Sequence, residues 1–462
     1  MNRSKKLYIL LGILAAACIA TFAVMQMEER KEQIKETGEV ILELPGESVQ
    51  SLSWDYNGSS LAFHRDGTWL YDEDENFPVS EEKINGLLEQ FQAFRAAFII
   101  EDVEDFGQYG LDDPVCTIRL SDGEQTYEIK LGDYSKMDSQ RYVSIGDGNV
   151  YLAKHDPLDE FNATIRNLID HDEVPEFDQV TGISFSGSEN YSITYEEEST
   201  DTYREEDVYF AQQDGKNLPL DTERVQDYLD NLGYLNLTDY VTYNATEEEL
   251  RTYGLDTPEL TVAVNYTVEE DGQERSDVFV LHVSRDPEEK KASKEKTEEE
   301  EITAYARVGD SRIIYRISSS GYQRLMAASY DDFRHLEVLP ASFEDIGQVD
   351  ILLEGSSRTL ISEGSDSGRT WFYQGEELEI ASFQSALNAL TADEFTDETP
   401  AGKEEIRLTV RLDREDSPEI QIVLYRYDGE RCIAAVNGES TCLVKRSAVV
   451  DLIEAVQAIV LS

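Results

Sequence analysis

The sequence predicts an α+β protein in which an N-terminal transmembrane helix precedes three tandem α+β repeats with mainly antiparallel sheets. Three observations support this prediction: an uncharged apolar run near the N-terminus, a six-residue motif that occurs twice in similar surroundings, and hairpin signals in three successive stretches. The length of 462 residues also suits three domains of roughly 150 residues each.

The composition excludes several classes of function. Lys and Arg number 40 against 96 Asp and Glu, which gives a formal charge of −56. Binding to nucleic acid or to an anionic lipid surface requires clustered positive charge, so neither is expected. Hydrophobic residues make up 40% of the chain and aromatic residues 10%, which argues against disorder throughout.

The first predicted element is a membrane anchor at residues 7–25. This run of 19 residues carries no charge and as a helix would span about 28 Å, close to the thickness of a bilayer core. Basic residues precede it, at Arg3, Lys5 and Lys6. The positive-inside rule therefore predicts a cytoplasmic tail at 1–6, a stalk at 26–45 and the bulk of the chain outside a bacterial cell membrane.

Two alternatives to a retained anchor remain open. A signal peptide cleaved after the small residues Ala15 and Ala17 would have a shorter apolar core than this run. Lipid attachment at Cys18 is the other alternative, although the preceding Leu14 is one position too far away for a lipoprotein site. We therefore expect a single-pass anchor.

The repeats are identified by a motif that occurs twice. Tyr109-Gly-Leu-Asp-Asp-Pro114 recurs 144 positions later as Tyr253-Gly-Leu-Asp-Thr-Pro258. Upstream of each copy, a cap residue (Ser80 or Asp221) precedes a stretch with apolar residues at spacing 0, 3, 4 and 7, which is one face of a helix. These apolar positions are Ile84, Leu87, Leu88 and Phe91 in one copy and Val225, Tyr228, Leu229 and Leu232 in the other.

A third, more divergent copy is predicted near the C-terminus. Thr370-Trp-Phe-Tyr373 resembles Thr68-Trp-Leu-Tyr71, and Thr409-Val-Arg-Leu412 matches Thr117-Ile-Arg-Leu120, but no Tyr-Gly-Leu motif occurs there. Each copy ends in a hairpin signal and a helix-like segment. The predicted repeats are 46–174, 175–340 with an acidic solvated loop at 286–301, and 341–462.

The repeated motif predicts a structural turn. Gly110 and Gly254 can adopt a positive φ, and Pro114 and Pro258 end any helix before the following strand. Tyr109 and Tyr253 begin the turn, and Leu111 and Leu255 are left to enter the core. A binding role for Asp112 and Asp256 is the alternative.

Cys432 and Cys442 flank the third hairpin. A three-residue loop ending at Gly438 would place them opposite each other, so a disulfide is a candidate in an extracytoplasmic protein. The corresponding tyrosines, Tyr142 with Tyr151 and Tyr305 with Tyr315, predict that these positions touch in all three hairpins.

No pattern in the sequence predicts a catalytic, cofactor or metal site. The five histidines form no H-x-x-x-H pair, and no nucleophile elbow or phosphate-binding loop occurs. We therefore predict no enzymatic activity and no cofactor. Catalytic carboxylates cannot be selected among 96 acidic residues.

The pattern resembles the bacterial envelope family called domain of unknown function 4340. The resemblance rests on the anchor, the Trp69 strand, the Pro78-Val-Ser80 helix entry and the two Tyr-Gly-Leu motifs. It also includes the stretch from Leu131-Gly132 to Tyr142-Val143. It implies association with an ABC-type transporter whose permease resembles gliding-motility proteins, and it implies no catalytic residues.

Three functions follow as hypotheses. The first is a membrane-anchored, extracytoplasmic, non-enzymatic accessory protein that serves as a scaffold or binding subunit of an ABC-type transporter, with the permease as partner. The second is a stand-alone module that binds cell wall or peptide, for which exposed tyrosines would provide stacking surfaces. The third is an envelope hydrolase.

Overall fold

The computed structural model describes residues 38–101, 103–213, 215–270, 272–292, 301–364, 368–414 and 417–459. The predicted tail at 1–6, the anchor at 7–25 and the stalk as far as residue 37 lie outside these ranges. Within them, no helix has both the length and the apolar character needed to cross a membrane.

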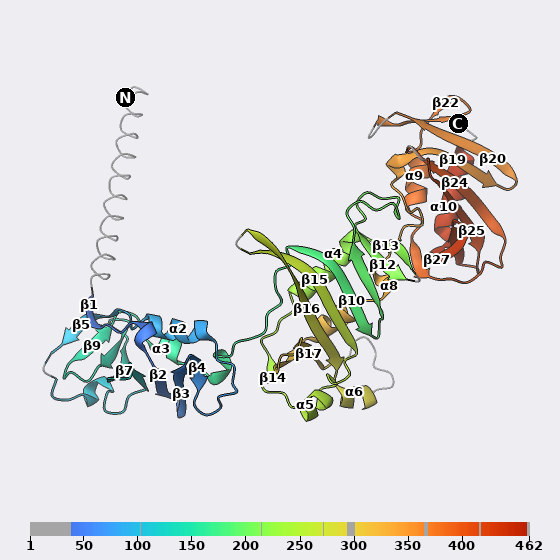
Figure 1. The fold of residues 1–462 in the computed structure, drawn as a ribbon. Helices are drawn as coiled ribbons and strands as arrows, with labels where there is room; N and C mark the ends of the chain where they lie inside the picture. The colour runs from blue at the N-terminus through green and yellow to red at the C-terminus, as the bar shows by residue number, and fades with distance from the viewer. Residues whose placement is uncertain are drawn as a thin grey trace, which may run out of the picture. The chain divides into compact units, whose positions relative to one another are not determined.

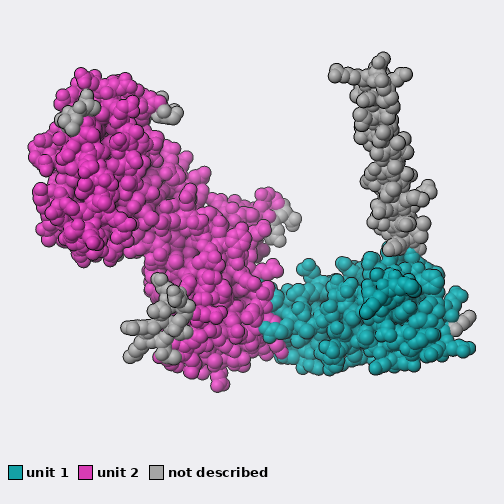
Figure 2. Space-filling view, turned by 180° about the vertical axis from the view of Figure 1, so that it is seen from behind, with its two compact units in different colours: residues 1–172 teal, residues 173–462 magenta. Residues whose placement is uncertain are grey.

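Three nine-stranded sheets dominate the fold, which confirms the α+β class with mainly antiparallel strands (Figure 1). All paired strands are antiparallel. The chain divides into two compact units, residues 1–172 with the first sheet and residues 173–462 with the other two (Figure 2). We call each sheet with its helices a repeat and number the repeats along the chain.

The three sheets share one order of eight strands. In repeat 1 this order is β5-β9-β8-β7-β6-β2-β3-β4, in repeat 2 β14-β18-β17-β16-β15-β10-β11-β12, and in repeat 3 β23-β27-β26-β25-β24-β19-β20-β21. The ninth strand differs: β1 joins β5 in repeat 1, whereas β13 and β22 extend the opposite edge of the other two sheets. The third repeat therefore has the shared strand order although it lacks the Tyr-Gly-Leu motif.

The strands have the following bounds. Repeat 1 contains β1 Glu39–Leu42, β2 Ser51–Tyr56, β3 Ser59–Asp66, β4 Thr68–Tyr71, β5 Phe94–Ile100, β6 Cys116–Ser121, β7 Thr126–Ser135, β8 Gln140–Ser144 and β9 Val150–Ala153. Repeat 2 contains β10 Gln179–Gly187, β11 Tyr191–Tyr195, β12 Tyr209–Gln213, β13 Lys216–Pro219, β14 Tyr240–Thr242, β15 Leu260–Glu270, β16 Gln273–Arg285, β17 Ala304–Val308 and β18 Ile314–Ile317. Repeat 3 contains β19 Ile346–Leu353, β20 Ser356–Glu363, β21 Thr370–Tyr373, β22 Glu376–Leu378, β23 Ala392–Phe395, β24 Glu404–Leu412, β25 Glu419–Arg426, β26 Arg431–Val436 and β27 Glu439–Lys445.

One helix precedes the long central strands of each repeat: α2 Glu81–Glu89, α4 Thr222–Gly233 and α9 Ala381–Asn388. The apolar faces of all three are buried, as the sequence spacing predicts for α2 and α4. The Ser80 side chain caps α2, and the Asp221 side chain caps α4. The other helices are α3 Leu158–Phe161, α5 Glu247–Thr252, α6 Pro287–Ala292, α7 Ser319–Met326, α8 Tyr330–Phe333 and α10 Arg446–Ala458.

The first sheet begins earlier than predicted. The predicted stalk extends to residue 45, but β1 occupies Glu39–Leu42 and pairs with β5, with Val40 opposite Arg95. The short apolar sequence Val40-Ile-Leu42 follows a long polar stretch. A strand this short forms only because β5 supplies hydrogen-bonding partners along its edge.

Candidate functional site

The repeated motif forms the predicted type of turn. Gly110 and Gly254 have φ of 72° and 73°, and each amide closes a tight turn by donating to a carbonyl three residues back. Leu111 and Leu255 are buried, and their amides donate to the carbonyls of Phe106 (3.1 Å) and Leu250 (2.8 Å). Pro114 and Pro258 stand two residues before strands β6 and β15.

The motif tyrosines pack against tyrosines of the hairpin predicted in the same repeat. Tyr109 packs on Tyr142 with ring centroids 4.9 Å apart, and Tyr253 packs on Tyr305 at 4.7 Å. The predicted pair of Tyr142 with Tyr151 is wrong, because Tyr142 lies opposite Leu152. The predicted pair in repeat 2 is likewise wrong, since Tyr305 lies opposite Arg316. In repeats 1 and 2 the motif thus holds the turn against strands β8 and β17, which carry Tyr142 and Tyr305.

The candidate disulfide is also corrected. Cys432 lies opposite Val444, and Cys442 lies opposite Ala434, so the two cysteines are diagonal neighbours and both are free thiols. The hairpin loop has two residues, Asn437 and Gly438, both with positive φ, and a bulge follows at Thr441, where the register shifts opposite Ala434 and Ala435. Diagonal positions are separated by about 7–8 Å, which is too far for a disulfide.

An ion-pair network repeats at equivalent positions of the first and third sheets. Arg119 on β6 binds Asp55 (2.6 Å) and Glu128 (3.2 Å). Arg411 on β24 binds Asp350 (2.9 Å) and Glu419 (3.3 Å) in the same arrangement. The sequence match between the Arg119 and Arg411 strands was the available signal, but the carboxylate partners come from other strands and could not be assigned.

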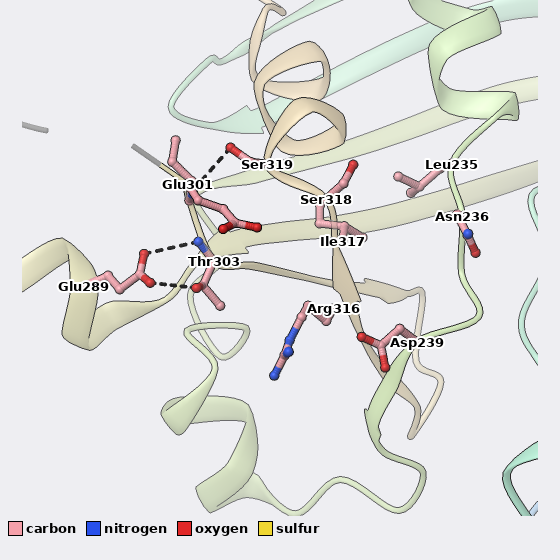
Figure 3. A pocket seen from close by; sticks show the side chains of 11 residues that line it. Leu235, Asn236, Asp239, Glu289, Glu301, Thr303, Arg316, Ile317, Ser318 and Ser319 are labelled. Atoms are coloured by element: carbon pink, nitrogen blue, oxygen red, sulfur yellow. Dashed lines mark hydrogen bonds between the residues drawn. The ribbon is translucent and has the colours of Figure 1, made fainter. Parts of the chain in front are cut away.

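A cleft in repeat 2 is the best candidate for a ligand site (Figure 3). Its volume is about 650 Å³. The loop after α4, helix α6, the approach to β17, strand β18 and the start of α7 form its walls. The lining residues are Leu235, Asn236, Asp239, Glu289, Glu301, Ile302, Thr303, Arg316, Ile317, Ser318 and Ser319.

Most polar groups in this cleft already have partners. Glu289 accepts hydrogen bonds from the Thr303 hydroxyl (2.6 Å) and the Thr303 amide (3.1 Å). Ser319 accepts from the Ile302 amide at 3.2 Å, and Ser318 caps α7. These bonds fix the walls of the cleft.

Arg316 differs from its neighbours. It alternates with buried residues on β18, so its side chain is exposed, while its amide donates to the Asp239 carbonyl at 2.7 Å. Its guanidinium forms no hydrogen bond or ion pair with the part of the chain that the structure describes, and in Figure 3 it points away from Ser318 and Ser319. The cleft therefore offers one available cation beside three carboxylates, those of Asp239, Glu289 and Glu301.

A second polar cluster lies in repeat 2, beside the segment that leads into repeat 3. His335 Nε2 lies 2.9 Å from Asp207 Oδ1, and the Thr202 hydroxyl donates to Asp207 Oδ2 at 2.6 Å. Asp207 is only 2% exposed. The second nitrogen of His335 lies 3.8 Å from Asp221 and 3.9 Å from Glu337.

Backbone contacts continue this junction into repeat 3. Arg414 donates to the Tyr203 carbonyl at 2.6 Å, and Arg204 donates to the Leu339 carbonyl at 3.2 Å. Tyr203 also forms a parallel bridge with Ala341. Nothing in the sequence motifs indicated this junction, because its partners are more than a hundred residues apart.

Among the described ranges, no group of three or more His, Cys, Asp and Glu side chains is arranged to hold a metal ion. Beside the aliphatic side chains of Leu235, Ile302 and Ile317, the cleft carries hydroxyls, carboxylates, an amide and a guanidinium, which suit hydrogen bonding to a polar ligand.

Comparison with known proteins gives one family. The model of "Domain of unknown function (DUF4340)" matches the chain twice, over residues 69–258 and 212–409. Each match runs from one repeat into the next. No curated protein and no solved structure matches the chain.

Proposed function

The chain belongs to the family of domain of unknown function 4340, and we propose that it is a membrane-anchored, extracytoplasmic, non-enzymatic accessory protein. In this proposal residues 7–25 cross the bilayer and the repeats act as a scaffold or binding subunit of an ABC-type transporter complex. The family match carries no activity of its own; the anchor sequence and the junction between repeats support an anchored scaffold, and the transporter partner follows only from what the family resemblance implies.

The observation that supports a scaffold is the junction of repeats 2 and 3. Arg414 donates to the Tyr203 carbonyl across the junction, Tyr203 bridges to Ala341, and the nearby Asp207 of repeat 2 is buried and bonded to His335 and Thr202. A junction built from buried polar groups is specific in geometry, because each group must meet its partner. Two sheets held in this way can present their surfaces to a partner as one body.

The direct test is photocrosslinking in intact cells followed by mass spectrometry. A photoreactive residue would replace exposed side chains of repeats 2 and 3, and an anchor-only chain would serve as the control. Enrichment of a permease and its ATPase over the control is the expected result. Recovery of wall fragments alone, or of no partner protein, would contradict the transporter role.

The cleft in repeat 2 favours a second candidate, a stand-alone module that binds cell wall or peptide. The available guanidinium of Arg316 can bind a carboxylate, and the nearby carboxylates and hydroxyls can bind ammonium or hydroxyl groups. Peptides and amino sugars with acidic substituents carry both kinds of group.

Binding of wall-derived peptides to the purified chain tests this second candidate. Arg316→Ala should weaken binding by about tenfold or more, the loss expected for a charge-assisted hydrogen bond. Arg324→Ala is a matched control, since Arg324 is an exposed arginine of the same repeat and does not line the cleft. Equal affinity of both variants would exclude the cleft as the binding site.

A further inference from the structure

Repeat 1 exposes an apolar patch close to where the described chain begins. Phe98 on β5 is 62% exposed, and Val40 on the neighbouring strand β1 is 38% exposed. The native tryptophans, in contrast, are all buried, with Trp54, Trp69 and Trp371 exposed by no more than 3%. Other large side chains are exposed as well, among them Met137 at 91% and Tyr234 at 88%, so the patch is distinguished by its position in the chain and not by exposure alone.

A bulge in β5 produces this exposure. Ala96 lies opposite Ala153 and is buried, but the register shifts between Ala96 and Phe98, so Phe98 lies opposite Leu152. Because successive residues point to opposite faces, the shift turns Phe98 to the face that also carries Arg95 and Val40. A regular strand would have turned Phe98 inward.

The patch also lies close in sequence to the apolar run at 7–25. Only twelve residues, 26–37, separate Met25 from Gly38, and Val40 follows two positions later. These residues span about 20 Å as a helix and at most roughly 45 Å when extended. If residues 7–25 cross a bilayer, β1 and the adjacent strand β5 lie near its surface.

We propose that Val40 and Phe98 form a membrane-facing patch that inserts into the interface of a zwitterionic bilayer beside the anchor. The inference depends on the proposed anchoring of residues 7–25. The occupant is lipid because the chain itself limits the distance between this patch and the bilayer. The Arg95 guanidinium, which donates to the Gly38 carbonyl at 2.8 Å, lies beside the patch within reach of lipid phosphates.

The overall charge of −56 does not oppose this contact. Contact through apolar side chains gains free energy from burial and needs no negative lipid, whereas an anionic surface would repel the acidic chain. The two-stage attachment, by a helix and then by a patch, would hold repeat 1 in a defined orientation on the membrane.

The test measures quenching of tryptophan fluorescence in the full chain, reconstituted in nanodiscs of phosphatidylcholine with brominated acyl chains. Phe98→Trp and Val40→Trp place a probe in the patch, and the buried native tryptophans provide a constant background. Val278→Trp is the matched control, since Val278 is 52% exposed on β16 of repeat 2. Leu14→Trp reports on the anchor.

Loss of the added fluorescence in Phe98→Trp, Val40→Trp and Leu14→Trp, with Val278→Trp unchanged, supports the patch. Quenching of Leu14→Trp without quenching at 98 or 40 overturns the patch but supports the anchor. The same result is expected if a protein partner, and not lipid, covers Phe98. No quenching at any position overturns both the anchor and the patch. Equal quenching at 98 and 278 also overturns the proposal, because contact would then not be specific to repeat 1.

Discussion

Gly110 is required in the motif for two reasons, its backbone conformation and the close packing around it. Its φ is positive, and a Cβ built there would lie 2.8 Å from Asp133 Cγ and 2.9 Å from the Asp133 amide nitrogen. Gly146 has a positive φ as well, but nothing lies within 4 Å of its added Cβ. Alanine substitutions at these two glycines therefore separate the free-energy cost of the positive φ from the cost of the contact with Asp133.

We expect Gly146→Ala to destabilise repeat 1 by about 1 kcal/mol through its left-handed backbone. Gly110→Ala should cost roughly 3 kcal/mol, because the backbone of β7 must also move. Urea unfolding followed by the fluorescence of Trp54 and Trp69 measures both losses in repeat 1. Equal losses would mean that the contact with Asp133 contributes nothing.

The cysteines of the third hairpin give a second prediction. Burial raises the pKa of the Cys432 thiol to about 11, and burial also raises the pKa of Cys442. A thiol that remains protonated and covered reacts slowly. We expect neither residue to be alkylated in the native chain, and both to be alkylated after denaturation without reductant. Protection that persists in denaturant until reductant is added would show a disulfide.

For single residues, the sequence predicts those features whose physical cause lies within a few neighbouring positions. A turn that needs glycine is visible in the motif because the steric reason lies within a few residues. The cysteine register is not visible, because it depends on a two-residue loop and a bulge at Thr441 together. The cleft around Arg316 combines segments from separate elements, so no local pattern marks it.

Among secondary-structure elements, Glu259 has a central position in repeat 2. It precedes β15 and accepts hydrogen bonds from the Arg285 amide (2.9 Å), the Tyr322 hydroxyl (2.8 Å) and Lys290. Burial alone would raise its pKa, but the hydrogen bonds from Lys290, Arg285 and Tyr322 outweigh burial and lower the pKa below the usual value. One carboxylate thus connects β15 to β16, α6 and α7.

This connection predicts a pH-dependent loss of stability. A lowered pKa means that the carboxylate stabilises the fold above the pKa of the unfolded chain, and that this contribution is lost as the pH falls through the folded-state value. Glu259→Gln should therefore lower stability by about 1–2 kcal/mol at neutral pH and much less near pH 3. Chemical denaturation at both pH values is the measurement. Glu274→Gln, at an exposed position of β16, should show no such difference.

Some secondary-structure elements are determined by neighbouring residues in the sequence, whereas others need a distant strand. Helices α2 and α4 were predictable with their caps, because the N-cap residues Ser80 and Asp221 directly precede the stretches with helical apolar spacing. Strand β1 was not, because it depends on the free edge of β5. The networks of Arg119 and Arg411 likewise need neighbouring strands to supply their carboxylates.

For the whole molecule, the question is which repeats unfold together. Repeats 2 and 3 lie in one compact unit and meet through Tyr203, which contacts Arg414 and Ala341, whereas repeat 1 forms a unit of its own. Coupled repeats behave as a single cooperative unit when their interface is strong compared with the stability of each. We therefore expect hydrogen exchange to show repeats 2 and 3 opening in one step and repeat 1 in another.

Asp207→Ala should uncouple repeats 2 and 3. The substitution removes the buried acceptor of Thr202 and the partner of His335, and leaving such groups unsatisfied costs about 2–3 kcal/mol. Because the loss falls on the junction and leaves the core of repeat 3 intact, peptides around Trp371 should keep their protection in denaturant while peptides from β12 and β13 lose theirs. Asp227→Ala, at an exposed position of α4, should leave the two repeats exchanging together. A uniform loss of protection across both repeats in Asp207→Ala would mean that the remaining contacts of Arg204 and Arg414 suffice to couple them.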